Sequence, residues 1–156
     1  MSRFRCVPID TDVAERFRAT GLDEGGNPVR RMIAPATGFP CRVCLRDAAV
    51  GEPVLLGSYH LPRPRGIYWT PSPIFVHAAP CTPFAAVGTV PEIVRGRLVS
   101  VRAYDDGDQC LYDLGHSGEG GGIDAPLAHA LADKRTAFVN IHTAKPGCLL
   151  CRVERE

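Results

Sequence analysis

Short apolar runs alternate with turn-forming residues along most of the chain, and this pattern is typical of a strand-rich fold. The runs are rich in Val, Ile, Leu or aromatic residues and are bounded by Gly, Pro or Asp, as β-strands are. They predict about eight strands, at residues 29–34, 41–45, 54–59, 74–77, 98–104, 110–114, 137–143 and 149–154.

Helical periodicity is confined to a few segments. Residues 11–20 carry apolar side chains on one face and follow a capping residue, Asp10 or Thr11, which predicts an amphipathic helix lying on a sheet. The same signals predict a short helical turn and a longer helix that starts at its N-cap Asp124, at residues 91–95 and 124–133.

Turn sequences set the expected architecture. Residues 105–108 and 144–147 separate apolar runs and predict two hairpins, while the prolines of the middle third predict loops there. No repeat or long linker divides the chain. We therefore expect an α+β fold in a single domain, residues 1–156, with one mostly antiparallel or mixed sheet covered by two or three helices.

Composition and charge argue against some classes of partner. The chain is 45% hydrophobic and 22% charged, with a formal net charge of +1, so it has no basic excess for nucleic acid or anionic membranes. The N-terminus lacks the apolar run of a secretory signal, and the most apolar stretch, 74–87, is broken by His77, Pro80 and Pro83. We expect a cytoplasmic protein without nucleic-acid or membrane partners.

The seven cysteines are then expected to be reduced thiols. Cys41 and Cys44, with Cys148 and Cys151, form two C-x-x-C motifs that together offer four thiolates to a structural zinc. Both motifs read as strands, however, and a strand points residues i and i+3 to opposite faces. The pattern therefore favours plain packing over zinc, and neither motif begins a helix that would activate a thiol for redox chemistry.

Histidines offer a second set of candidates. His142 and Cys148 flank one predicted hairpin and could form a nucleophile and its base. A four-residue turn pairs His142 with Leu149 and puts His142 and Cys148 on opposite faces; a buried, hydrogen-bonded histidine beside a small buried cysteine is the simpler interpretation. His60 and His77 end two strands and could join a metal site only through the tertiary fold.

Two further features favour structural interpretations. Residues 118–122, Gly-Glu-Gly-Gly-Gly, precede a helix but lack the Lys and Ser/Thr of a phosphate-binding loop, so a flexible loop is expected. Arg102 lies near Asp105 in a predicted strand. An ion pair that braces the hairpin is the simpler interpretation, although a strand-borne Arg beside a pocket would bind a carboxylate.

A series of short motifs carries a family resemblance: Gly38-Phe-Pro-Cys-Arg42, Ala48-Ala-Val-Gly-Glu52, Leu55-Leu56, Tyr59-His60, Ser72-Pro-Ile-Phe-Val76, Arg102-Ala-Tyr-Asp105, His142-Thr-Ala and Gly147-Cys148 with Arg152. From about residue 38 to 155 the chain resembles a bacterial domain-of-unknown-function family, number twelve-hundred-and-three in that series. The resemblance implies a small stand-alone cytoplasmic protein and no established activity.

The resemblance also bears on the site. The family pattern contains the equivalents of Cys41, Arg42, His142 and Cys148, whereas Ser or Ala is expected at the other two C-x-x-C positions. This weakens the four-thiolate model and favours a site that combines Cys41, His60, His142 and Cys148. Family members usually have Asn where this chain has Thr143, so an amide role at that position is in doubt.

Three functions follow as hypotheses, and the last of them is a binding module without chemistry in which the motif residues only brace hairpins. The first is a small-molecule enzyme or ligand-binding protein whose catalytic residues are Cys148, His142 and Cys41, and whose substrate-binding residues are Arg42, His60 and Arg102. The second is a zinc-binding structural or regulatory module built from Cys41, Cys44, Cys148 and Cys151 or from a Cys/His subset. The sequence names no cofactor, reaction or oligomeric state.

Overall fold

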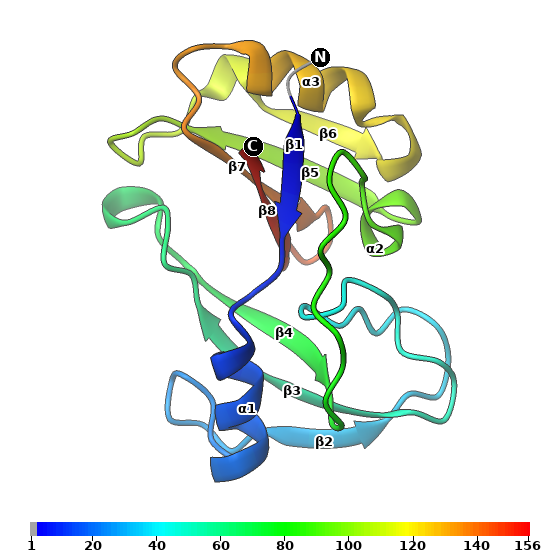
Figure 1. Cartoon of the computed structure of the whole chain (residues 1–156). Helices are drawn as coiled ribbons and strands as arrows, with labels where there is room; N and C mark the ends of the chain where they lie inside the picture. The colour runs from blue at the N-terminus through cyan, green and yellow to red at the C-terminus, as the bar shows by residue number, and fades with distance from the viewer. Residues whose placement is uncertain (1–2) are drawn as a thin grey trace.

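The computed structural model describes residues 3–156, which fold as an α+β protein with two sheets (Figure 1). A five-stranded antiparallel sheet has the order β1 (Phe4–Val7), β8 (Leu149–Arg155), β7 (Phe138–Thr143), β5 (Leu98–Tyr104), β6 (His116–Glu119). A three-stranded antiparallel sheet has the order β2 (Arg30–Ile33), β3 (Pro53–His60), β4 (Pro71–His77). The helices are α1 (Thr11–Thr20), α2 (Glu92–Arg95) and α3 (Asp124–Ala132), with short 3-10 turns at Gly66–Tyr68, Tyr112–Leu114 and Gly120–Gly122.

The expectation of a single sheet is therefore wrong, although the α+β class is confirmed. Strand β4 is an edge of the smaller sheet, and its register places Pro71 opposite His60 and Pro73 opposite Ser58 of β3. Because proline has no backbone N–H to donate, a strand with two prolines suits an edge. After β4 the chain passes through an irregular segment and α2 and then joins the five-stranded sheet as β5, instead of extending the smaller sheet.

Six of the expected strands are present, but residues 41–45 and 110–114 are not strands. The first is a tight turn in which Leu45 N–H donates to Cys41 O at 3.0 Å and Leu45 has φ of 55°. The second contains the 3-10 turn Tyr112–Leu114. Strands β1 and β6 were not predicted, because both are short and carry charged or small polar residues that give no apolar run.

All three helices lie where the sequence predicts them, and α1 has the predicted ends. The Asp10 side chain accepts from Asp12 N–H at 3.0 Å, and Gly21 ends the helix with φ of 66°, which favours glycine. The prediction of Asp124 as an N-cap is wrong: its carboxylate instead accepts from Arg95 Nη2 at 2.8 Å.

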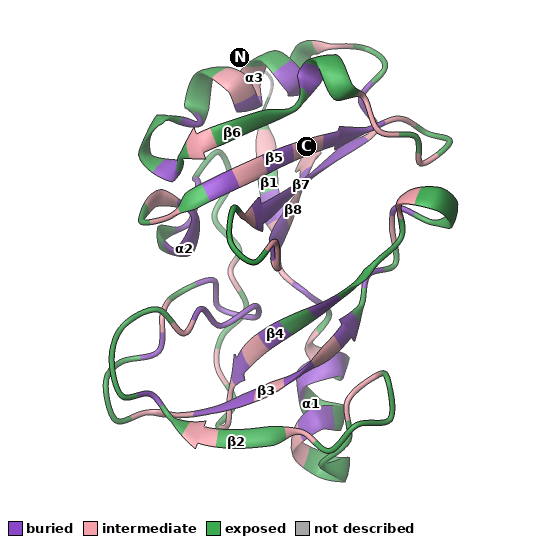
Figure 2. Ribbon diagram, turned by 180° about the vertical axis from the view of Figure 1, so that it is seen from behind, coloured by how far each residue is buried: buried purple, intermediate pink, exposed green. Residues whose placement is uncertain are grey.

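Each sheet has its own core. The larger core lies between the five-stranded sheet and α2 and α3, and the second core packs α1 against the three-stranded sheet. Leu149 of β8 belongs to this second core, so the two sheets meet along β8. Figure 2 shows buried residues concentrated in β7 and β8, with β2 largely exposed at the far edge.

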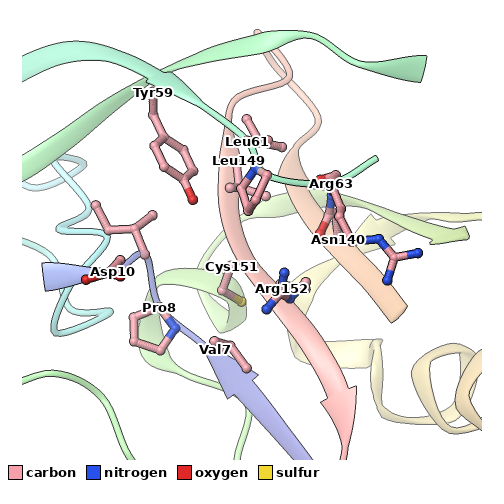
Figure 3. Close-up of a pocket in the computed structure, with 12 residues that line it drawn as sticks. Val7, Pro8, Asp10, Tyr59, Leu61, Arg63, Asn140, Leu149, Cys151 and Arg152 are labelled. Atoms are coloured by element: carbon pink, nitrogen blue, oxygen red, sulfur yellow. Dashed lines mark hydrogen bonds between the residues drawn. The ribbon is translucent and has the colours of Figure 1, made fainter. Parts of the chain in front are cut away.

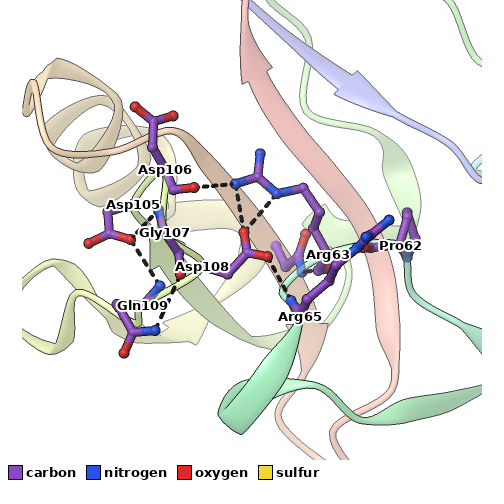
Figure 4. Close-up of polar contacts among 9 residues, drawn as sticks. Pro62, Arg63, Arg65, Asp105, Asp106, Gly107, Asp108 and Gln109 are labelled. Atoms are coloured by element: carbon purple, nitrogen blue, oxygen red, sulfur yellow. Dashed lines mark hydrogen bonds and ion pairs between the residues drawn. The ribbon is translucent and has the colours of Figure 1, made fainter.

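The turn at residues 105–108, which follows β5 of the larger sheet, contacts the segment between β3 and β4 of the smaller sheet (Figure 4). Asp108, which has φ of 61°, accepts from Arg63 Nε at 2.7 Å and from Arg65 N–H at 2.8 Å. The Arg65 N–H and the Arg63 guanidinium lower the pKa of Asp108. The expected Arg102–Asp105 ion pair does not form among residues 3–156; Asp105 accepts backbone N–H groups of its own turn instead.

The glycine-rich residues 118–122 are ordered elements and not the expected flexible loop. They form the end of β6 and the 3-10 turn Gly120–Gly122. Gly120 is buried, and its N–H donates to Arg97 O at 2.7 Å. A side chain there would meet the Val94 carbonyl oxygen at 1.7 Å, so this contact of the turn with α2 requires glycine.

Candidate metal centre

Three segments bring a compact group of metal-ligating side chains together. The turn after Pro40 supplies Cys41 and Cys44, the end of β4 supplies His77, and the segment that follows supplies Cys81. One ligand atom from each of the four residues lies within 4.8 Å of the others. We call this set the Cys/His cluster.

The turn after Pro40 directs the side chains of Cys41 and Cys44 the same way. A strand would have separated their sulfurs, but the bond from Leu45 N–H to Cys41 O closes the chain into a turn. Backbone N–H groups of Val43, Cys44 and His77 point toward the Cys41 sulfur, as they would to stabilise a thiolate. The strand argument against this C-x-x-C motif therefore fails.

The thiols of the turn are strongly coupled. A hydrogen bond with the Cys44 thiol, aided by the backbone N–H groups, lowers the pKa of Cys41 to about 7 against the opposing effect of burial. The same bond, together with burial, raises the pKa of Cys44 to about 12. A divalent cation would change this balance, because a coordinating thiol is deprotonated by the metal.

Two of the separations between ligand atoms match those of a tetrahedral zinc. Cys41 Sγ lies 3.8 Å from Cys81 Sγ, and Cys44 Sγ lies 3.6 Å from His77 Nδ1. Bonds of about 2.3 Å to sulfur and about 2.0–2.1 Å to nitrogen, at tetrahedral angles, put two sulfurs about 3.8 Å apart and a sulfur and a nitrogen about 3.6 Å apart. Both separations agree with one Cys₃His site.

A carboxylate orients the histidine of the cluster. His77 turns Nδ1 toward the thiols, while its Nε2 lies 3.3 Å from Glu52 Oε2. Glu52 is itself held, because its Oε1 accepts from Ala49 N–H at 2.7 Å. Metal-ligating histidines commonly donate their second ring nitrogen to a carboxylate in this way. Arg18 of α1 also fixes the backbone by donating to His77 O at 3.0 Å.

The second C-x-x-C motif lies only partly in a strand, because β8 contains Cys151 but begins after Cys148, and the motif does not reach the cluster. Cys148 is half-buried just before β8, and Cys151 is fully buried in the larger core. A hydrogen bond with Cys6, together with burial, raises the pKa of Cys151. In residues 3–156 the four thiolates of the two motifs thus form no common ligand set; Cys41 and Cys44 are joined by His77 and Cys81.

His142 and Cys148 have the predicted register, with His142 opposite Leu149 and an irregularity in the ladder beside it. His142 is 3% exposed, and its Nδ1 lies 2.9 Å from Gly147 O. A carbonyl oxygen only accepts, so Nδ1 carries the proton. Burial, followed by the positive charge of Arg102, lowers the pKa of His142 to about 4.

This burial predicts a pH dependence of stability. Between pH about 6.5 and about 4 the unfolded chain protonates His142 while the folded chain does not, so the free energy of unfolding falls as the pH is lowered, by up to about 3 kcal/mol. His142→Asn keeps a donor near Gly147 O and removes the titrating ring. Urea unfolding should show a smaller loss for this variant across the window; equal losses would contradict the assignment.

The other predicted binding residues are dispersed. Arg42 is 2% exposed and donates from Nε to Leu149 O at 2.7 Å and from Nη1 to Pro40 O; burial lowers its pKa to about 10. His60 is exposed and lies edge-on to Trp69, with ring centroids 5.4 Å apart. Arg102 donates from Nε to Ser100 Oγ at 3.2 Å and lines an open groove beside β5.

Sequence reasoning gave His77 only a general part in a metal site and gave Cys81 no role. A signal was present: Cys41-x-x-Cys44 is followed by His77-x-x-x-Cys81, and pairs with these separations are common in structural zinc sites. The strand interpretation of the first motif obscured it.

Fold and cluster together define an α+β protein with two antiparallel sheets and a candidate Cys₃His metal centre between irregular segments. The chain belongs to the family described as Protein of unknown function (DUF1203), whose model matches residues 38–155. All four residues of the cluster lie within that match. No curated protein and no solved structure matches the chain. None of the helices in residues 3–156 is long and apolar enough to cross a membrane.

Proposed function

We propose that this chain is a zinc-stabilised module in which Cys41, Cys44, His77 and Cys81 hold one structural Zn²⁺. The observation that carries the proposal is the agreement of two independent ligand separations, 3.8 Å and 3.6 Å, with a tetrahedral Cys₃His site. The carboxylate of Glu52 behind His77 supplies the outer contact that such a site uses.

Four protein ligands support a structural role over a catalytic one. A catalytic zinc keeps one position open for water or substrate, whereas a site with four protein ligands is closed. The three cysteine ligands come from segments that lack regular secondary structure, the turn after Pro40 and the segment after His77, and His77 is the last residue of β4. Zinc would tie these segments to each other and to the end of β4.

Metal content tests the proposal directly. Untagged protein, purified without chelators, should contain about one equivalent of zinc per chain by elemental analysis. Cys81→Ser should lose most of it, because three remaining ligands bind zinc much more weakly. Cobalt substitution should give the visible absorption of a tetrahedral thiolate site.

Cys110→Ser is the matched control, since Cys110 is also half-buried and lies outside the cluster. It should keep its zinc. Less than about a tenth of an equivalent in the wild-type protein, or equal metal content in the two serine variants, would exclude the structural site.

The small-molecule hypothesis remains a second prediction, with Cys148, His142 and Cys41 as chemical groups. What supports it is the surroundings of Cys41: the Cys44 thiol and nearby backbone N–H groups lower the pKa of Cys41 to about 7, which would make its thiolate available near neutral pH. It predicts that metal-free protein alkylates fastest at one cysteine. Equal, slow alkylation of all seven cysteines would contradict it.

A further inference from the structure

A cavity of about 350 Å³ lies between the two sheets, away from the Cys/His cluster (Figure 3). Its walls come from the ends of β1 and β3, the segment after β3, and strands β7 and β8. Pro8, Leu61 and Leu149 supply much of the apolar surface. Small-molecule sites have volumes of about 300–1,000 Å³ and are mostly apolar with a few placed polar groups, so the size suits a small ligand.

Arg152 brings a free donor to this cavity. The register aligns Arg152, Asn140 and Arg102 across β8, β7 and β5, on the face of the sheet that looks toward the smaller sheet. Arg152 Nη2 pairs with Glu154 Oε1 at 2.7 Å, but Nε is buried and has no hydrogen-bond partner in the described chain. An unsatisfied buried donor is costly, and an acceptor from a ligand would satisfy it.

Tyr59 supplies the second polar group. Figure 3 shows its hydroxyl directed from β3 into the space that Arg152 enters from β8. No side-chain hydrogen bond contributes to the pKa of Tyr59, which burial raises to about 12. The hydroxyl therefore stays protonated and free to donate.

Arg63 lines the same cavity but its charge is already committed. Its guanidinium pairs with Asp108 (Figure 4). It also lies over the Phe138 ring, 4.4 Å from the centroid. Asn140 Nδ2 donates to Arg63 O at 3.3 Å, which holds this part of the wall in place. Arg152 is also paired, with Glu154, but its Nε keeps a donor without a partner in the described chain.

We propose that the inter-sheet cavity binds a small organic carboxylate with an apolar body, whose carboxylate accepts from Arg152 Nε and whose polar contacts are completed by the Tyr59 hydroxyl. Arginine donors suit carboxylates, and the apolar wall takes the rest of the molecule. The site shares no residue with the Cys/His cluster, so it stands independently of the proposed zinc.

The test uses benzoate and 3-phenylpropionate as probes, each compared with its neutral primary amide. In ¹⁵N NMR of the zinc-saturated protein, the Arg152 Nε–H signal, assigned by its loss in Arg152→Lys, should shift saturably with at least one carboxylate. The matching amide should bind at least about tenfold more weakly, because it lacks the charge that strengthens the Arg152 hydrogen bond.

Variants separate the site from nonspecific anion binding. Arg152→Gln should weaken carboxylate binding by about tenfold or more, and the conservative Tyr59→Phe should weaken it several-fold while the protein stays folded. Arg31→Gln, which removes an exposed arginine of β2, should leave the dissociation constant unchanged. An unmoved Nε–H signal, amides that bind as tightly as the acids, or full binding by Arg152→Gln would each overturn the proposal.

Discussion

Removal of zinc from the Cys/His cluster is expected to lower the midpoint of thermal unfolding by about 10 °C or more. Free metal at about 1,000 times its dissociation constant stabilises the folded state by about 4 kcal/mol. For a chain of this length, each kcal/mol moves the midpoint by about 2–4 °C. Calorimetry of the protein before and after chelation, and after zinc is restored, measures the change.

The loss of stability on zinc removal should begin near the Cys/His cluster. Hydrogen exchange should quicken first in the turn Cys41–Cys44 and in residues 78–90, which the metal would tie together, and much less in β7, where the ladder and the larger core are independent of the cluster. Cys81→Ser should behave like the chelated protein, and Cys110→Ser like the zinc-loaded one. A midpoint that chelation leaves unchanged would show that the cluster contributes no metal-linked stability.

Local signals explain what the sequence predicts correctly. Helix α1 begins and ends where Asp10 accepts from Asp12 N–H and where Gly21 adopts a positive φ, and both effects depend on near neighbours only. The β7–β8 hairpin is equally local, since its turn sets the register that pairs His142 with Leu149. The division into two sheets does not depend on near neighbours in the sequence. It depends on which sheet edge a later strand can still pair with once β4 is in place.

At the metal site, the apolar composition of residues 41–45 led to the wrong prediction of a strand. Residues 41–45 are apolar enough to read as a strand, but Leu45 adopts φ of 55° and the turn directs both sulfurs the same way. That conformation is supported by contacts from far along the chain, including the bond from Arg42 N–H to Phe75 O at 3.0 Å. His77 joins the site only because β4 ends beside this turn.

The cavity between the sheets was beyond sequence reasoning for the same reason. Arg152 stands in a strand whose neighbours on the core side are Cys151 and Val153, so alternation predicts a solvent-facing arginine. Its Nε is nevertheless buried, and Arg152 lines a cavity together with Tyr59 of the smaller sheet. The free donor is a product of the two-sheet arrangement, which no local pattern predicts.

Gly120→Ala is expected to destabilise the fold by about 3 kcal/mol or more, for a reason that the sequence also conceals. The new Cβ would lie 1.7 Å from Val94 O and 3.0 Å from Arg97 O. These are backbone atoms in α2 and just after it, so no side chain can rotate away, and the turn must separate from this part of the chain. Such overpacking costs about 1–3 kcal/mol or more, and the lost bond from Gly120 N–H to Arg97 O adds to it.

Gly122→Ala is the matched control, because it lies in the same turn, is exposed, and its Cβ would meet nothing within 4 Å. Its effect should stay within about 0.5 kcal/mol. Denaturant unfolding of both variants, each saturated with zinc, measures the difference. A large loss for Gly120→Ala alone follows only if the turn after β6 is packed on α2; equal stabilities would mean that these glycines form the flexible loop their composition suggests.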